Sequence, residues 1–280
     1  MNKAYALIEL MRLDKPIGIY LLLWPALIAL VISTGGNFQY SDLFIVIIGS
    51  IIVRSAGCVI NDIWDKDLDG GVERTKLRPI PSKKVSINES WALFIVLGVV
   101  SLILLSLTNI NTILISLCFG LMIIVYPLTK RFFIGPQIFL GLTFNPTIIV
   151  YAMTNELNNS TMIFLYLAFA AMTIAFDTLY GMCDKDDDKN LGINSTPLWW
   201  GSNTLVIIMI FQLLSICLLL MVGWQAELKL IWFIGTIFLS GFYFYQHHLA
   251  KKKKYLLAFK NNHLASFYLL MLSVFCILII

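Results

Sequence analysis

The chain has 280 residues, of which 59% are hydrophobic and 13% are charged, and its formal net charge is +4. A mean hydropathy of +0.84 is too high for one soluble globular domain, because the folded surface would expose large apolar areas to water. The composition therefore excludes a soluble protein and gives no indication of a nucleic-acid partner. It indicates an integral membrane protein.

Apolar runs divide the chain into nine candidate membrane helices, each near the roughly 20 residues that a bilayer requires. They cover residues 17–33, 43–60, 90–107, 111–126, 134–153, 161–180, 203–222, 228–246 and 264–280. The first run follows a charged stretch and lacks a small-residue cleavage site, so we interpret it as a membrane helix and not as a removable signal. We expect an all-α integral membrane protein, a bundle of nine transmembrane helices forming a single domain over residues 1–280.

Basic residues gather on one side of this predicted topology. Eighteen of the twenty Lys and Arg precede the first helix or lie in the even-numbered connections, and of the other two only Lys229 lies in an opposite loop. The positive-inside rule then predicts a cytoplasmic N-terminus. After nine crossings, the C-terminus lies outside. The run Lys251–Lys254 is expected to meet anionic lipid headgroups.

The first acidic motif, NDIWDKDLDG over residues 61–70, follows the second apolar run directly. If the helix continues past the apolar boundary, Asn61, Asp65 and Asp69 fall at i, i+4 and i+8, with Asp62 beside them. One helix face then presents three carboxylates and an amide. We expect the Gly-Gly pair at 70–71 to end this helix.

The second motif lies in AFDTLYGMCDKDDDKNLG, residues 175–192. Its residues Asp177, Tyr180, Asp184 and Asp188 stand at i, i+3, i+7 and i+11, a spacing that predicts one stripe along the sixth helix. Asp177 falls inside the apolar segment, where an ionisable group is costly and indicates a functional site facing a cavity.

Nine of the sixteen acidic residues occupy these two stretches, and a tenth, Glu73, follows the first closely, all on the same predicted side of the membrane. Two apposed carboxylate stripes repel each other, and a bound cation would remove the conflict. Oxygen ligands at this density suit Mg²⁺ or Mn²⁺, and Mg²⁺ keeps coordination sites for substrate phosphates. The alternative is that the acids are solvated charges balancing nearby lysines, an interpretation that suits Asp67, Asp186 and Asp187 best.

The two motifs, N-D-x-x-D-x-x-x-D from Asn61 and D-x-x-Y-x-x-x-D-x-x-x-D from Asp177, resemble those of the UbiA superfamily of membrane prenyltransferases. Four longer blocks are similar to bacterial 4-hydroxybenzoate polyprenyltransferases: LMRLDKPIGIYLLLWP, RSAGCVINDIWDKDLDGGVERTKLRPIPS, YPLTKRFFIGPQIFLGLTF and DTLYGMCDKDDDKNLGINST. These blocks run from the first helix to the start of the seventh. The last two helices match in hydropathy alone.

The resemblance implies a nine-crossing bundle in a bacterial inner membrane, with a cavity open toward the cytoplasmic side and laterally to lipid. It implies Mg²⁺-dependent transfer of a polyprenyl chain from polyprenyl diphosphate to 4-hydroxybenzoate, ortho to the hydroxyl, as a step of ubiquinone biosynthesis. A naphthoate or homogentisate acceptor is an alternative within the family. A cation-coupled transporter is the alternative from another class, and it predicts carboxylates near the bilayer midplane.

The resemblance assigns candidate roles to motif residues. The candidate metal ligands are Asn61, Asp62, Asp65, Asp69, Asp184 and Asp188. The candidate diphosphate contacts are Arg74, Arg78, Lys130, Arg131 and Lys185, because guanidinium and ammonium groups bind phosphate oxygens. For any single basic residue, the positive-inside bias is a rival explanation.

The remaining candidates would act on the allylic cation and on the aromatic acceptor. Tyr126, Tyr180 and Trp64 are close enough in sequence to the motifs to stabilise an allylic cation through their ring faces. Arg54, inside the second helix, is the candidate to hold the acceptor carboxylate, with Arg131 as rival. Asp177 is the candidate to orient the phenol or accept a proton, a structural hydrogen bond being the alternative.

Two departures from the family pattern bear on the site. Asn194 stands where relatives usually carry a basic residue, so one diphosphate contact is in question. Asn145-Pro146 stands in the predicted helix 134–153, where a proline is expected to perturb the helix and the shape of the cavity.

Overall fold

The computed structural model describes residues 3–279, and within this range every regular element is a helix. The α-helices are α1 (Lys3–Leu10), α2 (Ile17–Ser33), α3 (Tyr40–Trp64), α4 (Ile87–Leu105), α5 (Ile110–Thr129), α6 (Pro136–Thr143), α7 (Thr147–Met153), α8 (Ser160–Gly181), α9 (Lys185–Leu191), α10 (Thr196–Trp200), α11 (Thr204–Gln225), α12 (Leu230–Lys251) and α13 (Tyr255–Val274). Short helical turns form η1 (Asp69–Gly71), η2 (Gly201–Asn203) and η3 (Phe275–Ile279). The all-helical class is thus confirmed.

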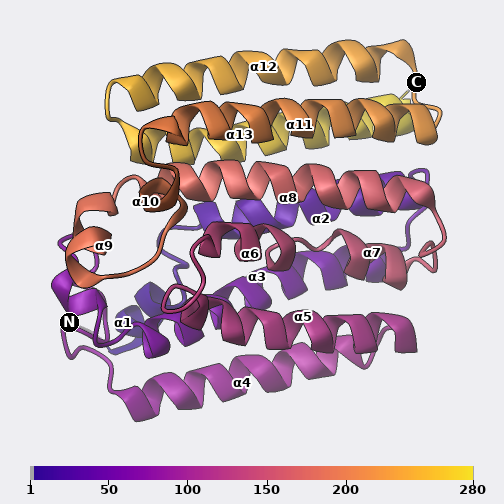
Figure 1. Cartoon of the computed structure of the whole chain (residues 1–280). Coiled ribbons are helices and arrows are strands. Elements are labelled where there is room, and N and C mark those ends of the chain that lie inside the picture. Colours follow the sequence, from indigo (N-terminus) through magenta and orange to yellow (C-terminus); the bar gives the residue numbers. More distant parts are fainter. Residues whose placement is uncertain (1–2, 280) are drawn as a thin grey trace.

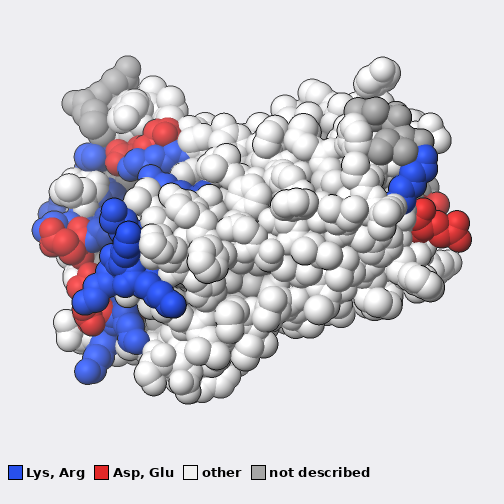
Figure 2. Space-filling model, turned by 90° about the horizontal axis from the view of Figure 1, so that it is seen from above, with Lys and Arg blue, Asp and Glu red and all other residues white. Residues whose placement is uncertain are grey.

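The long helices lie alongside one another, with the short helices α1, α9 and α10 together at one end of the bundle (Figure 1). Most visible charged residues gather at this same end, and a smaller group lies at the opposite end (Figure 2). The surface between the two ends is almost free of charge in this view. We call the end that carries α1, α9 and the connection 65–86 the polar end.

Among the described residues, five stretches are long and apolar enough to cross a membrane: α3, α4, α5, α8 and residues Thr196–Gln225, which include α11. Helix α2 is apolar but shorter, with 17 residues. The apolar runs predicted at 228–246 and 264–280 form α12 and α13 with η3, apart from residue 280, which lies outside the described residues. A multi-pass membrane protein is therefore supported, while the count of nine crossings stays a prediction.

The core surrounds α8, whose side chains pack against α11, α13 and α2. Leu165, Ala168 and Phe169 of α8 are almost completely buried among residues of these neighbours. Helix α4 is the opposite case: it packs mainly on α3, and among its residues only Ser90 is buried. Its exposed apolar side chains suit contact with lipid tails, whose polarity matches theirs.

The predicted helix 134–153 is interrupted between Thr143 and Thr147, which confirms that the proline perturbs it. Asn145 is buried and holds the interruption in place. Its Nδ2 donates to the Tyr166 carbonyl of α8 at 2.7 Å, and its Oδ1 accepts from the Thr147 hydroxyl at 2.8 Å. The amide thus satisfies polar groups that the missing helical turn would otherwise leave unpaired.

The helices that carry the acidic motifs end earlier than predicted. Helix α3 ends at Trp64 and not at the Gly-Gly pair, which belongs to η1, and α8 ends at Gly181 before the chain resumes as α9. Like charges four residues apart destabilise a helix. Because α3 ends before Asp65, Asp65 meets Lys130, while Asp62 and Asp69 share Arg78.

We expect Asn145→Ala to lower the free energy of unfolding by about 1–3 kcal/mol, because two buried polar groups lose their partner. Unfolding of the detergent-solubilised protein measures the change. Asn158→Ala, at an exposed asparagine before α8, is the control and should stay within about 0.5 kcal/mol of wild type. Equal stability of the two variants would contradict the role given to Asn145.

Candidate active site

One cavity of about 1400 Å³ brings the two acidic motifs together. Asn61, Asp62, Asp65 and Asp69 line it from α3 and the connection that follows, and Asp177, Tyr180, Asp184 and Asp188 line it from α8 and α9. The lining continues along α5 from Lys130 at the polar end to Thr112 near the opposite end. The cavity therefore joins a charged compartment to a long, mainly apolar one.

Basic side chains neutralise the first motif. Arg12 donates from Nη2 to both carboxylate oxygens of Asp62, at 2.8 and 2.7 Å. Arg78 donates from Nη1 to Asp62 at 3.1 Å and to Asp69 at 2.8 Å, and Lys130 donates to Asp65 at 2.7 Å. All three carboxylates are at least 95% buried, so each needs such a partner to remain charged.

Burial and charge act in opposite directions on these groups. Burial lowers the pKa of Arg78, but the carboxylates of Asp62 and Asp69 outweigh burial and raise it above its ordinary value. Burial also raises the pKa of Asp69, despite the opposing effect of Arg78. Arg78 thus stays a cation between two carboxylates, and it ties the connection after α3 to the end of that helix.

The second motif has its own arginine. Arg74 donates to both oxygens of Asp184 and to the Tyr180 hydroxyl, and its guanidinium carbon lies 4.5 Å from the centroid of the Tyr180 ring. Burial, followed by the neighbouring Asp184 carboxylate, raises the pKa of Asp188 to about 6. The like charge that acts on Asp188 thus comes from within the second motif, whereas the repulsion that the sequence predicted was between the two motifs.

The donor set suits a hard divalent cation. Within residues 3–279, no group of three carboxylate, His or Cys side chains is close enough to hold a metal, because the aspartates are paired with Arg and Lys. One buried oxygen, Oδ1 of Asp65, has no hydrogen-bond partner among the described residues. Carboxylate and amide oxygens are the ligands that Mg²⁺ prefers. The residues therefore fit Mg²⁺ chemically, with basic side chains as its competitors.

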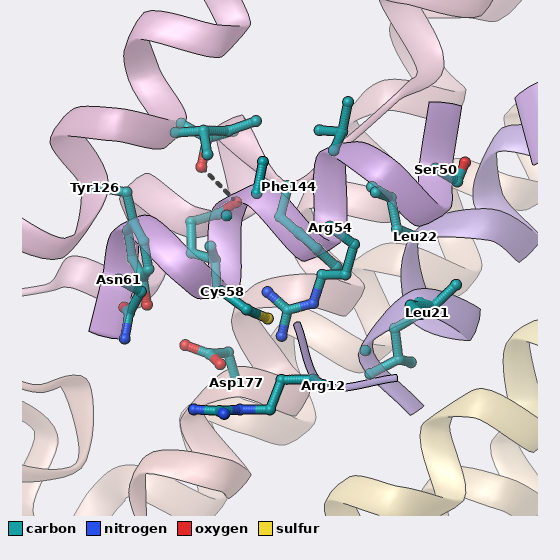
Figure 3. Close-up of a pocket in the computed structure, with 18 of the residues that line it drawn as sticks. Arg12, Leu21, Leu22, Ser50, Arg54, Cys58, Asn61, Tyr126, Phe144 and Asp177 are labelled. Atoms are coloured by element: carbon teal, nitrogen blue, oxygen red, sulfur yellow. Dashed lines mark hydrogen bonds between the residues drawn. The ribbon is translucent and has the colours of Figure 1, made fainter. Parts of the chain in front are cut away.

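Deeper in the cavity, Arg54 on α3 and Asp177 on α8 point toward one another, with Arg12 nearby and Asn61 beside Tyr126 (Figure 3). The Arg54 guanidinium lies over the Phe144 ring, 5.2 Å from its centroid, and its buried Nε has no hydrogen-bond partner among the described residues. Arg54 therefore offers an unused donor inside the membrane-spanning part of the cavity.

Three predicted residues lie apart from this cavity. Its described lining includes neither Arg131 nor Lys185, and Arg131 donates to the Trp64 carbonyl at 2.7 Å. Trp64 packs edge-on against Trp91 of α4. Asn194 does line the cavity, and its backbone N–H donates to the Lys130 carbonyl at 2.9 Å. The departure at Asn194 thus lies beside the lysine that meets Asp65.

The structure adds cavity residues that sequence reasoning did not assign to the site. Arg12 lies in the RLDKP stretch, whose similarity to the family was noted, and its backbone φ of 59° is a left-handed value unusual for arginine. That stretch was a usable signal. Phe144 had a similar signal, because it ends the quoted block YPLTKRFFIGPQIFLGLTF and adjoins the helix break expected at Asn145-Pro146. Phe259 had none, because it lies outside the quoted blocks and before the predicted run 264–280.

Comparison with known proteins identifies relatives across nearly the whole chain. A sequence model described as the UbiA prenyltransferase family matches residues 22–277. The 4-hydroxybenzoate octaprenyltransferase of Vibrio campbellii is 39% identical over 266 residues, which cover 94% of each protein. The protein of the same name from Psychromonas ingrahamii is 40% identical over 267 residues, covering 94% of this chain and 93% of that one.

Solved structures share the fold at lower identity. A UbiA homologue from Aeropyrum pernix K1, solved without ligand, superposes with a TM-score of 0.80 at 22% identity, covering 90% of this chain and 94% of that one. A UbiA homologue from Archaeoglobus fulgidus bound to GPP and Mg²⁺ gives a TM-score of 0.74 at 16% identity, covering 97% and 99%.

We expect Arg78→Gln to lower the free energy of unfolding by about 3–5 kcal/mol, because Asp62 and Asp69 lose a shared buried cation. Lys76→Gln is the control: Lys76 forms an exposed pair with Glu73, and loss of such a pair costs at most about 1 kcal/mol. Chemical unfolding in detergent compares the two variants. Similar losses would show that Arg78 does not stabilise the connection.

Proposed function

Because the chain belongs to the UbiA prenyltransferase family, we propose that it transfers a polyprenyl chain from polyprenyl diphosphate to 4-hydroxybenzoate. The chain joins the ring carbon ortho to the hydroxyl, a step of ubiquinone biosynthesis. The observation that carries this proposal is the single cavity in which two aspartate motifs and their basic partners meet a long apolar compartment. Such a cavity suits a molecule with a diphosphate at one end and a hydrocarbon chain at the other.

The diphosphate is proposed to bind at the polar end, where Arg74, Arg78 and Lys130 line the cavity. Each of these cations now contacts an aspartate and would exchange that carboxylate for phosphate oxygens. The proposed metal ligands are Asn61, Asp62, Asp65, Asp69, Asp184 and Asp188. When bound, Mg²⁺ supplies positive charge that stabilises the developing charge on the leaving diphosphate. Arg131 and Lys185 stay predictions without support from the cavity lining.

The proposed reaction breaks the bond between C1 of the prenyl chain and the bridging oxygen, and the electron pair leaves with the diphosphate. The guanidinium and ammonium groups at the polar end stabilise that charge. The π electrons of the acceptor ring then form the new bond to C1, and the attacked carbon loses its proton. Asp177 would orient the phenol or accept the proton, and Tyr180 and Tyr126, which also line the cavity, would stabilise the allylic cation.

The acceptor carboxylate is proposed to bind Arg54. The support is its cavity position, its unused Nε and its place over the Phe144 ring. An aromatic acid held there would lie between Arg54 and Asp177, below the polar end. A cation–carboxylate contact in this poorly solvated region is strong and directional.

In the membrane, we propose nine crossings formed by α2, α3, α4, α5, the α6–α7 pair, α8, α11, α12 and α13. The polar end would face the cytoplasm of a bacterial cell at the inner membrane, because it carries most of the basic residues. The N-terminus then lies inside and the C-terminus outside. Surrounding lipid would deliver the prenyl substrate to the apolar compartment.

We expect labelled 4-hydroxybenzoate to be converted to a lipid product by detergent-solubilised protein with a long polyprenyl diphosphate, and only when Mg²⁺ is present. Asp65→Ala and Asp184→Ala should each lower the rate by at least about 100-fold, because both remove stabilisation of the leaving group. Asp67→Ala and Asp186→Ala, at exposed positions of the same two segments, are matched controls that should retain most of the rate.

Product formed with a naphthoate or homogentisate but not with 4-hydroxybenzoate would contradict the proposed acceptor but would agree with the proposed prenyl-transfer mechanism. Absence of product with every acceptor would overturn the proposed reaction and return attention to a transport function.

We expect Arg54→Ala to raise the KM for 4-hydroxybenzoate by about 10- to 100-fold, the worth of one charge-assisted contact, with the KM for the diphosphate nearly unchanged. Steady-state kinetics with each substrate varied in turn measure both. The uncharged analogue 4-hydroxybenzaldehyde serves as control, because its use should not depend on Arg54. An equal rise in both KM values would contradict the assignment.

A further inference from the structure

Aromatic rings from two helices that are distant in sequence meet beside the second acidic motif. Phe259 of α13 lies against Tyr180 of α8, with ring centroids 4.7 Å apart, and against Phe176 at 6.0 Å. All three line the cavity, and Leu256 and Lys260 extend the same wall of α13. We propose that Phe259 is a catalytic residue that forms, with Tyr180, an aromatic platform for the positive charge that develops on the prenyl chain.

A cation already lies over the Tyr180 ring of this platform in the structure. The guanidinium carbon of Arg74 lies 4.5 Å from the Tyr180 ring centroid while its nitrogens contact Asp184. The Tyr180 ring therefore presents its face to a cation that also contacts Asp184. A diphosphate bound by Arg74 beside Asp184 would place the adjacent C1 carbon near the same rings.

The chemistry of the step favours aromatic rings at this position. As the C1–oxygen bond breaks, its electron pair leaves with the diphosphate, and positive charge spreads over C1 and C3 of the allyl group. A carboxylate touching C1 would capture it as an ester, whereas a ring face stabilises the charge without forming a bond. The acceptor ring then closes the new carbon–carbon bond and the charge leaves as a proton.

Phe259 lines the cavity, whereas Phe211, which packs on the same hydrophobic cluster, is absent from its described lining. Both pack on the same hydrophobic cluster around Ala175, Leu179 and Ile208. Phe211 stacks on Trp200, 5.9 Å away, and is absent from the described cavity lining. A substitution at Phe211 therefore reproduces any general loss of packing, without the proposed contact to substrate.

The inference rests on the proposed prenyl transfer, and graded fluorination tests it. Replacing Phe259 by mono-, di- and trifluorophenylalanine weakens the ring quadrupole stepwise with little change of shape. We expect the single-turnover rate of transfer to fall with each fluorine, to about 3- to 30-fold below wild type for the trifluoro ring, as expected for a desolvated cation over a ring face. Cyclohexylalanine at the same position is apolar and of similar size but has no ring quadrupole, so it should lower the single-turnover rate at least as much. The KM for polyprenyl diphosphate should stay within about twofold in all these variants.

The same series at Phe211 should leave the rate near wild type. A flat rate across the Phe259 series, or equal declines at the two positions, would overturn the role of Phe259 while wild-type transfer continues. Failure of the wild-type protein to transfer a prenyl chain at all would instead overturn the proposed function, and this inference with it.

Discussion

The neutralisation of carboxylates buried at one end of a membrane bundle is the constraint on which the rest of the structure depends. Asp62, Asp65 and Asp69 are at least 95% buried, and unpaired charges there would cost several kcal/mol each. Arg12, Arg78 and Lys130 come from three different segments of the chain to meet them. These contacts fix the N-terminal segment, the connection after α3 and the end of α5 around one point.

Under the proposed function, the same contacts would hold ready the cations that bind an anionic substrate. A cation that now holds an aspartate can exchange it for a phosphate oxygen only if the freed carboxylate gains another positive partner, and a divalent metal is such a partner. Metal and diphosphate are therefore expected to bind together, because each supplies what the other removes from the ion pairs. The compartment along α4 and α5 would receive the hydrocarbon chain, because its lining is mainly apolar.

The all-helical class and the meeting of the two acidic motifs could be predicted from the sequence. Apolar runs indicate which segments are buried or in lipid, and the spacing of the carboxylates indicates which of them lie on one side. The apolar run 161–180 matched the end of α8 at Gly181 closely. The expectation that both helices continue through their acidic motifs was wrong, because the aspartates meet basic partners far along the chain. Arg12 meets Asp62 across fifty positions, and such pairing follows from tertiary packing. Phe259 lies on a helix with no motif, so only its position beside Tyr180 identifies it.

A double-mutant cycle on substrate binding tests the central claim, that the two aspartate motifs hold one metal–diphosphate unit between them. The affinity of an unreactive polyprenyl thiodiphosphate would be measured by calorimetry, with and without Mg²⁺, for wild type, Asp65→Asn, Asp184→Asn and the double variant. The account predicts a coupling of at least about 1 kcal/mol in Mg²⁺ that disappears without the metal. Additive effects in Mg²⁺ would show that the motifs act separately and would contradict it.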